Sequence, residues 1–213
     1  MMAEDAMETA CRSGARAAAQ RTRILQAAQK CFVEHGFHAA SMATIAQTAE
    51  MSPGLIYRYF RSKSEIILAI IERQLEIVRE RIGSLHVAND LAAGIADSFH
   101  APTDCHDDMI IAPLFLETSA EATRDPQVGA AVAAVDTAVR TEFTRVLMRA
   151  REEGGYGLPE ELATKRALML LCLFEGLKVR EAREPHLDHG LLESALGDIL
   201  GLLLAPQSAE PAG

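Results

Sequence analysis

Apolar residues recur every three or four positions along most of this chain of 213 residues. Such spacing places apolar side chains on one face of a helix, and no stretch shows the alternation in steps of two that is typical of β-strands. Gly36, Gly83 and Pro126 interrupt the pattern, as does the stretch 154–159 with its glycines and its proline. Residues of these types end helices. The pattern therefore predicts an all-α fold.

Two short helices joined by a tight turn are predicted in the segment SMATIAQTAEMSPGLIYRYF. Ser41 precedes the first apolar stripe, the stripe breaks at Glu50, and Ser52 with Pro53 restarts a helix. Serine caps the free amides of a helix start, and proline at the first helical position gives up only an amide that had no partner. This arrangement is typical of a helix-turn-helix, whose second helix enters the major groove of DNA.

The second helix of this pair has one apolar and one polar face. Ile56 and Phe60 fall on the side that faces a core. The residues left to face DNA are Pro53, Gly54, Leu55, Tyr57, Arg58 and Tyr59. Gly54 permits close approach of the backbone, Leu55 suits a thymine methyl group, and Arg58 suits guanine or phosphate.

Further helices are predicted on both sides of this pair. Upstream, the apolar stripe that begins at Ile24 ends at Gly36. Downstream, Ser62 and Glu65 have the spacing of a capping box, in which each side chain bonds the other residue's backbone amide. The next helix is therefore predicted to begin directly after Ser62.

Formal charge is divided unevenly along the chain, whose net charge at pH 7 is -9. Residues 12–63 contain eight basic and two acidic side chains, whereas residues 82–213 contain ten basic and 21 acidic ones. A basic module on an acidic body favours nucleic-acid binding by the first part, because the body repels DNA and so helps to orient docking.

The segment from Arg21 to Leu75 resembles the DNA-binding domain of the TetR family of transcriptional repressors. The resemblance rests on three motifs in order, GFHAASMATIAQ, SPGLIYRYF and SKSEIILAI. It implies that Pro53 to Phe60 is the recognition helix, that two tyrosines and a lysine hold phosphates, and that the start of the preceding helix lies against the DNA backbone. The DNA-binding residues expected on these grounds are Ser41, Ala43, Thr44, Ser52, Pro53, Gly54, Leu55, Tyr57, Arg58, Tyr59 and Lys63.

Glu50 departs from the family pattern, because relatives usually carry glycine in this turn. If the turn needs a left-handed backbone, glutamate costs about 1 kcal/mol there. An acidic side chain close to DNA also lowers affinity.

The chain divides into four expected segments. They are a flexible basic N-terminal arm (1–19), the helix-turn-helix domain (20–66), a helical ligand-binding and dimerisation domain (67–205) and a disordered tail (206–213). In the third segment, helices are predicted at 85–99, 109–123, 162–183 and 191–204 and along a valine stripe that follows Pro126.

Methionine and phenylalanine side chains in the third segment are candidates for a soft ligand pocket, because they adapt to varied ligands. Taken one at a time, each of them is better explained by ordinary core packing. The candidate ligand-binding residues are His100, Met109, Phe115, Glu117, Phe143, Met169, Cys172 and Phe174. Glu175 is a further polar candidate, and none of these residues names a ligand.

The segment ALMLLCLF is apolar on all sides, so it must be covered on more than one side. A partner subunit would provide that cover. The expected dimer interface contains Val132, Val135, Val139, Phe143, Leu170 and Leu173. Two recognition helices would then enter successive major grooves roughly 34 Å apart.

The expected function is that of a ligand-responsive transcriptional regulator. It would act as a homodimeric repressor that a small-molecule inducer releases from a palindromic operator. Two alternatives remain open, namely an architectural helix-turn-helix DNA binder without a ligand and a helical-bundle enzyme. The sequence lacks the motifs that an enzyme of this kind needs, namely paired inward Glu-x-x-His motifs, a glycine-rich phosphate loop, and a spaced nucleophile and base. No enzymatic activity is therefore expected.

The remaining chemistry-bearing residues indicate no cofactor. The stretch HAPTDCHDD (100–108) gathers histidine, cysteine and aspartate without the fixed spacing of a metal site, so no metal is expected. The four cysteines are scattered and are typical of reduced thiols. No signal peptide is visible, and no apolar run reaches the roughly 18 residues of a membrane span. We therefore expect a cytoplasmic protein without membrane contact.

Overall fold

The computed structural model describes residues 2–84, 111–184 and 186–205, and within these ranges side chains are described from residue 14 onward except at 81, 83 and 84. All regular secondary structure in these ranges is helical, which confirms the predicted all-α fold. The helices are α1 (Met2–Ala39), α2 (Met42–Thr48), α3 (Pro53–Tyr59), α4 (Lys63–Ser84), α6 (Ala112–Ala122), α7 (Pro126–Met148), the short 3-10 helix η1 (Arg151–Glu153), α8 (Glu160–Arg183) and α9 (His189–Leu204).

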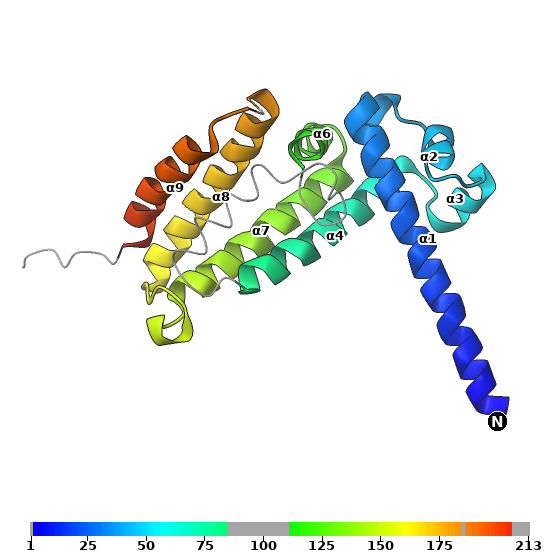
Figure 1. The fold of residues 1–213 in the computed structure, drawn as a ribbon, viewed down its shortest axis with the longest axis horizontal. Helices are drawn as coiled ribbons and strands as arrows, with labels where there is room; N and C mark the ends of the chain where they lie inside the picture. Colours follow the sequence, from blue (N-terminus) through cyan, green and yellow to red (C-terminus); the bar gives the residue numbers. More distant parts are fainter. Residues whose placement is uncertain (1, 85–110, 185, 206–213) are drawn as a thin grey trace, which may run out of the picture.

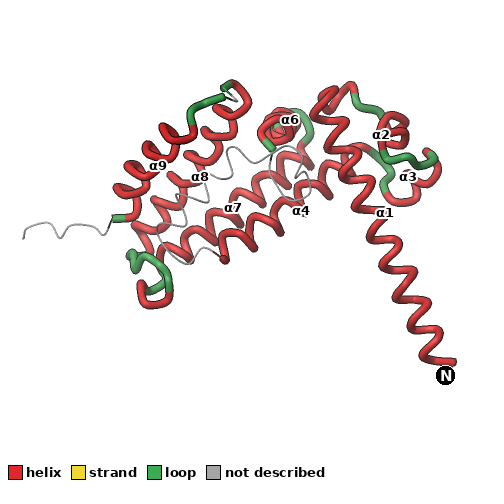
Figure 2. Tube along the Cα trace, viewed as in Figure 1, coloured by secondary structure: helices red, strands yellow, loops and turns green. Residues whose placement is uncertain are grey.

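The helices form a head and a body (Figure 1). We call α1 to α3 with the first turn of α4 the head, and the rest of α4 with α6 to α9 the body. In the body, α4 and α7 lie side by side, α8 packs along α7, and α9 lies against α8 (Figure 2). The head sits at the α6 end of this bundle, and α2 and α3 lie together on one side of α1.

The first half of α1 projects away from the rest of the molecule (Figure 1). The sequence predicts a flexible arm at residues 1–19, whereas the structure continues the helix back to Met2. Alanine, arginine, methionine and glutamate are frequent in this stretch, and all four favour helix. Local propensity therefore favours the helix in this projecting stretch.

Each short helix of the head begins at a serine cap, as predicted. The hydroxyl oxygens of Ser41 and Ser52 accept hydrogen bonds from amides three residues on, at 3.0 and 3.3 Å. Ser62 accepts from the amide of Glu65 at 3.1 Å. The return bond of this capping box differs from the prediction, because the Glu65 carboxylate accepts from the amide of Arg61 at 2.6 Å.

Two residues turn the chain between the helices of the head. Gly36 has a φ of 77° and interrupts α1 three residues before its end, where the sequence predicts a stop. Glu50, in the turn between α2 and α3, has a φ of 52° and is the one non-glycine residue with positive φ among the described residues. The left-handed backbone considered for this position is therefore present.

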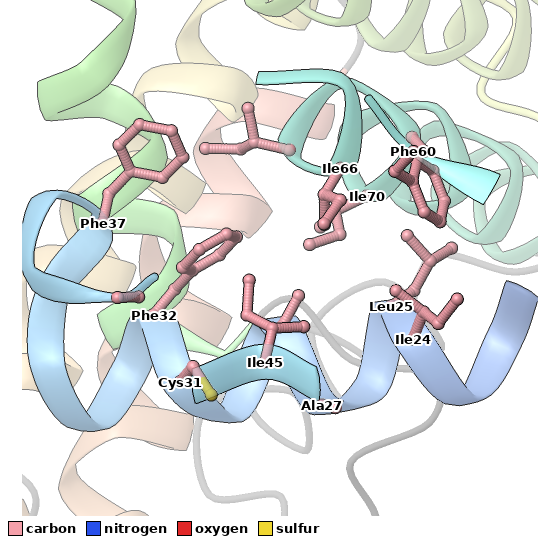
Figure 3. Packing of buried hydrophobic residues seen from close by; sticks show 14 of the residues in the cluster. Ile24, Leu25, Ala27, Cys31, Phe32, Phe37, Ile45, Phe60, Ile66 and Ile70 are labelled. Atoms are coloured by element: carbon pink, nitrogen blue, oxygen red, sulfur yellow. The ribbon is translucent and has the colours of Figure 1, made fainter. Parts of the chain in front are cut away.

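One apolar core fills the head and continues into the body. Phe32, Ile45 and Ile66 are fully buried in it, and Figure 3 shows these side chains converging from α1, α2 and α4. Leu114 of α6 and Val128 of α7 are fully buried in the same cluster. The predicted domain boundary between residues 66 and 67 falls inside α4 and inside this core, so no solvent-exposed linker separates head from body.

A second apolar cluster fills the body between α4, α7, α8 and α9. Val139, Leu170 and Leu196 belong to it. The long valine-striped helix, the break at Gly154 and the last two helices follow the predicted order. The predicted helix at 85–99, the stretch 100–108, Met109 and the tail 206–213 lie outside the described residues.

Candidate nucleic-acid interface

The polar face of α3 is open to solvent. Tyr57 is 54% exposed, and Ser52, Pro53, Gly54 and Arg58 are exposed beside it. Leu55 and Tyr59 are half-buried, while Ile56 and Phe60 point into the core with 0% and 2% exposure. The division into a core face and an outer face follows the prediction, because the two buried residues lie four positions apart on one side of the helix.

The start of α2 lies next to this face. Ser41 and Ala43 are exposed and Thr44 is half-buried. The hydroxyl groups of Ser41 and Thr44 lie 2.8 Å apart and share a hydrogen bond. The helix-turn-helix therefore exposes Ser41 at the start of α2 as well as the outer residues of α3.

Lys63 occupies a more restricted place than the other candidates. Its ammonium group donates to the carbonyl oxygens of Phe37 and His38, at 2.7 and 3.1 Å, and lies 4.8 Å from the centre of the Phe37 ring. Partial burial lowers the pKa of Lys63, and the nearby carboxylate of Glu121 opposes that shift. The ammonium therefore joins the start of α4 to the corner between α1 and α2, and this bonding competes with a phosphate contact.

Arginines of α1 reach the helix-turn-helix in two places that sequence reasoning missed. The guanidinium of Arg21 stacks 4.6 Å from the centre of the Phe60 ring. Arg23 pairs with the Glu50 carboxylate at 2.6 Å, and both side chains are largely exposed. The charge of the acidic residue in the turn is thus partly neutralised by α1. No sequence signal reveals a pair 27 positions apart.

The candidate ligand residues that the structure describes are spread over α6, α7 and α8. Phe115, Phe143 and Phe174 are half-buried on α6, α7 and α8, whereas Met169 and Cys172 are exposed on α8. His100 and Met109 lie outside the described residues. Glu117, a further candidate, points to the head instead: its carboxylate accepts a hydrogen bond from the Phe37 amide at 2.8 Å.

Buried polar atoms and perturbed acids mark a different part of the body. Gln74 Nε2 of α4 and Thr118 Oγ1 of α6 are buried without a hydrogen-bond partner in the described part of the chain. Burial raises the pKa of Asp136 on α7, and Arg140 partly offsets the shift. Burial, followed by the charge of Asp136, raises the pKa of Glu175 on α8.

The residues predicted for a dimer interface are mostly covered by their own protomer. Val139 and Leu170 are 7% and 1% exposed, and Val132, Val135, Phe143 and Leu173 are half-buried against the two cores. The face that α8 and α9 turn to solvent instead carries large apolar side chains. They are Leu168, Met169, Leu191, Ile199 and Leu202. An apolar segment without periodicity does not show which of its side chains point outward.

An open groove of about 800 Å³ lies at the end of the body remote from the head (Figure 1). Arg140, Thr144, Arg149 and Thr164 are among the residues that line it. Of the predicted ligand-binding residues that lie in the described ranges, none lines this groove. Within the described ranges, no group of three histidine, cysteine or acidic side chains is placed to hold a metal ion. No described helix is both long and apolar enough to cross a bilayer.

Comparison with known proteins agrees with this geometry. Residues 24–70, which include the helix-turn-helix, match the model described as bacterial regulatory proteins, tetR family. The HTH-type transcriptional regulator UidR of Escherichia coli strain K12 is 35% identical over 161 residues, which are 74% of this chain and 79% of UidR. The chain belongs to the tetR family. Its members are DNA-binding transcriptional regulators and not enzymes, so the polar face of α3 belongs to a DNA-binding head.

Solved structures of similar proteins extend the likeness over the body. Salmonella enterica GusR matches with a TM-score of 0.68 and 26% identity, over 87% of this chain and 95% of GusR. A transcriptional regulator from Rhodococcus sp. Rha1 matches with a TM-score of 0.69 and 21% identity, over 86% of this chain and 95% of that one. The second match shows a shared fold alone. The tetR-family architecture of helix-turn-helix head and helical body is therefore common to all three chains.

Proposed function

We propose that this tetR-family regulator is a homodimeric repressor, which binds a palindromic operator and which a small molecule releases. The observation that carries the proposal is the solvent-open face of α3, held by a head whose core is continuous with the body. A surface of this kind reads DNA only if its support is rigid, and the shared core provides that support.

Residues of α3 would determine which DNA sequence is preferred. The hydroxyl groups around α3 would bond phosphates and so fix the position of the protein along the DNA. Arg58 is exposed and has the length and charge to bond guanine or a phosphate. Tyr57, Ser41 and Thr44 offer hydroxyl groups suited to phosphate oxygens. Lys63 contributes to the same surface through its charge, although its ammonium is shared with two backbone carbonyls.

The second copy would dock on the outer face of α8 and α9. Met169, Leu191 and Leu202 are 48%, 63% and 73% exposed there, and most of the large apolar side chains that are exposed in the described ranges lie on these two helices. Burying each such side chain contributes about 1.5–3 kcal/mol. An isologous pair of these faces would cover them in both protomers and would set two copies of α3 about 34 Å apart.

The body would hold the releasing ligand near the polar groups of its central helices. Gln74 and Thr118 have buried polar atoms without protein partners in the described ranges, and Asp136 and Glu175 are acids with raised pKa values. A buried donor without a partner is costly, and a ligand that bonds it recovers that cost. These groups therefore support a polar ligand that accepts hydrogen bonds from amide and hydroxyl donors.

DNA selection tests the first half of this proposal. The full-length protein is used to select duplexes from a random pool, and the enriched sequence is titrated with wild type, Arg58→Ala and Lys63→Ala. A palindrome should emerge. Arg58→Ala should lose about 1–3 kcal/mol and relax preference at one position per half-site, whereas Lys63→Ala should weaken all duplexes alike. Failure to enrich any sequence would leave an architectural DNA binder as the better description.

Metabolite screening by thermal shift, in the presence and absence of the selected duplex, tests the second half. A releasing ligand should weaken operator affinity 5–150-fold, and the operator should weaken the ligand by the same factor. Gln74→Ala should reduce the affinity of that ligand without changing the affinity for DNA alone. A screen in which every hit binds equally with and without DNA would contradict ligand control.

Sedimentation tests the dimer. Leu202→Glu places a charge on the proposed interface and should give folded monomers at micromolar concentration. Ala133→Glu, on the exposed side of α7, is the matched control and should remain dimeric. The monomers should bind the selected palindrome far more weakly, because each half-site alone is weak. A wild-type protein that is monomeric and still binds tightly would overturn this assembly.

A further inference from the structure

The corner between α1 and α2 is held by side chains of the body. At Gly36 the backbone leaves the helical conformation, with φ 77° and ψ 158°. The amide of the next residue, Phe37, donates to Glu117 Oε2 of α6 at 2.8 Å, across 80 positions of sequence. A Cβ atom on Gly36 would lie 3.5 Å from the same carboxylate oxygen. The Glu117 carboxylate therefore sits directly on the corner.

A second carboxylate lies one turn further along α6. The Glu121 side chain is only 8% exposed, and its Oε2 lies 3.2 Å from His38 Nε2, without hydrogen-bond geometry. From the other side, Lys63 at the start of α4 donates to both carbonyls of the corner. Three elements from distant parts of the chain, α6, α4 and the α1–α2 corner, therefore meet at residues 37 and 38.

The apolar and polar contacts at this junction have different consequences. Leu114 and Val128 bury apolar surface against the head core. Apolar burial is non-directional, so it keeps head and body together but tolerates small rotations between them. A hydrogen bond weakens steeply when its angle departs from linearity. The bond from Phe37 to Glu117, at 2.8 Å, is thus a contact that resists rotation of the head, together with the longer bond of 3.4 Å from the Ser64 hydroxyl to the Asp125 carboxylate.

We propose that Glu117 is a positioning residue for DNA binding, which fixes the angle of the head on the body through the Phe37 amide. The proposal rests on the dimeric DNA-binding function above, because the angle of each head sets the distance between the two copies of α3. Lys63 supports the same corner through its hydrogen bonds to the carbonyl oxygens of Phe37 and His38, and the Glu121 carboxylate lies beside His38. Removing the Glu117 carboxylate frees each head to rotate and relaxes the half-site spacing that the dimer accepts.

Amide exchange tests the contact without any DNA. Hydrogen exchange at Phe37 is compared in wild type, Glu117→Ala and Glu117→Gln. The alanine variant should exchange at least tenfold faster at Phe37, and glutamine, which keeps an acceptor oxygen, should restore part of the protection. Ser119→Ala is the matched control, because the Ser119 hydroxyl bonds the Phe115 carbonyl within α6. Unchanged exchange at Phe37 in the alanine variant would overturn the proposal.

Half-site spacing tests the consequence. The selected palindrome is compared with versions that carry one base pair more or less between the half-sites. Wild type and Ser119→Ala should discriminate strongly against the altered spacings. Glu117→Ala should lose at least fivefold of that discrimination while its thermal midpoint and its affinity for single half-sites stay close to wild type. Full discrimination in Glu117→Ala would show that the corner does not set the head angle.

Hydrogen exchange at Phe37 and the preference for half-site spacing distinguish a failure of the Glu117 proposal from a failure of the proposed function. If wild type selects no palindrome, the proposed function fails, and exchange at Phe37 still decides whether Glu117 holds the corner. If a palindrome is selected and Glu117→Ala keeps its spacing preference, the function stands and the inference fails.

Discussion

Glu50 places a strained backbone conformation in the turn between α2 and α3. Its φ of 52° is a conformation that a side chain with a Cβ adopts at a cost of about 1 kcal/mol. The exposed carboxylate also stands at the helix-turn-helix, where Arg23 pairs with it at 2.6 Å. Exposed pairs of this kind contribute little to stability, so Arg23 does not repay the strain.

Replacing Glu50 by glycine should therefore stabilise the protein. We expect Glu50→Gly to raise the free energy of unfolding by about 0.5–1 kcal/mol, because glycine adopts positive φ without strain and loses only part of that gain to chain entropy. Affinity for DNA should also rise, since a negative charge is removed. Urea denaturation and duplex titration measure the two effects. Glu50→Gln is the control: it removes the charge and keeps the strain, so it should improve binding alone.

Asp136 gives the stability of the body a specific pH dependence. Burial raises its pKa above the ordinary value of 3.8, so the folded chain holds this proton at pH values where the unfolded chain has released it. The contribution of Asp136 to stability is therefore greatest below pH 3.8 and falls as pH rises through the folded pKa. The charge of Arg140 partly offsets the rise in the pKa of Asp136 without reversing it.

Asp136→Asn should remove the loss of stability that accompanies rising pH in the wild type. The difference in unfolding free energy between variant and wild type should grow in favour of the variant as pH rises from below 3.8, and then level off. Denaturation of both proteins across that range measures it. The same substitution should lower the pKa of Glu175, whose shift is caused partly by Asp136. A difference that is constant with pH would show that Asp136 is not buried in solution.

At the scale of single elements, α8 has apolar side chains in the body core and others exposed to solvent, and its composition does not distinguish the two sets. Leu170 is 1% exposed in the body core, while its neighbour Met169 is 48% exposed. The sequence predicts that this segment needs cover on more than one side. It assigns Leu170 to the partner, because an apolar run without period carries no signal of orientation.

Leu170→Ala should accordingly act on the protomer itself. We expect it to lower the free energy of unfolding by about 2–5 kcal/mol, since it leaves a cavity in the core. Lys165→Ala on the same helix should change stability by about 0.5 kcal/mol or less, because its ion pair with Glu161 is exposed. Chemical denaturation compares them. If Leu170→Ala and Lys165→Ala both changed the free energy of unfolding by a similar, small amount, Leu170 would lie at a surface.

Signals that act over a few residues could be read from the sequence, and contacts between distant segments could not. Ser41 and Ser52 bond amides three positions on, so their caps follow from local pattern, as does the break at Gly36. The resemblance adds the assignment of the DNA-facing residues, which remains a prediction. Glu117 bonds an amide 80 positions away, and nothing in its own neighbourhood distinguishes it from a pocket-lining acid.

At the scale of the whole molecule, the two apolar cores divide the chain differently from the domains that its charge suggests. The segment with an excess of basic residues ends near Lys63, but the head core extends to Val128 on α7. Stability of the head therefore depends on body residues. The second core, which includes Val146 of the same helix, belongs to the body alone.

Two matched substitutions on α7 test this division. Val128→Ala should lower stability by about 2 kcal/mol and should speed hydrogen exchange in α1 to α3 as well as in α6. Val146→Ala removes the same atoms from the second core and should speed exchange chiefly in α7 to α9. Exchange mapped by mass spectrometry distinguishes the two patterns. A Val128→Ala protein whose head keeps wild-type protection would indicate that the head is stable by itself.

The continuous core also constrains how regulators of this type can be recombined. A chimera cut between residues 66 and 67 would join this head to the body of another regulator. The head would then lose the apolar contacts of Leu114 and Val128 and the Glu117 carboxylate that accepts from Phe37. Such a fusion exposes apolar surface on both pieces and leaves the Phe37 amide without a partner. A transferable DNA-reading cassette from this protein consequently includes the matching residues of α6 and the start of α7, so the exchangeable unit is discontinuous in sequence.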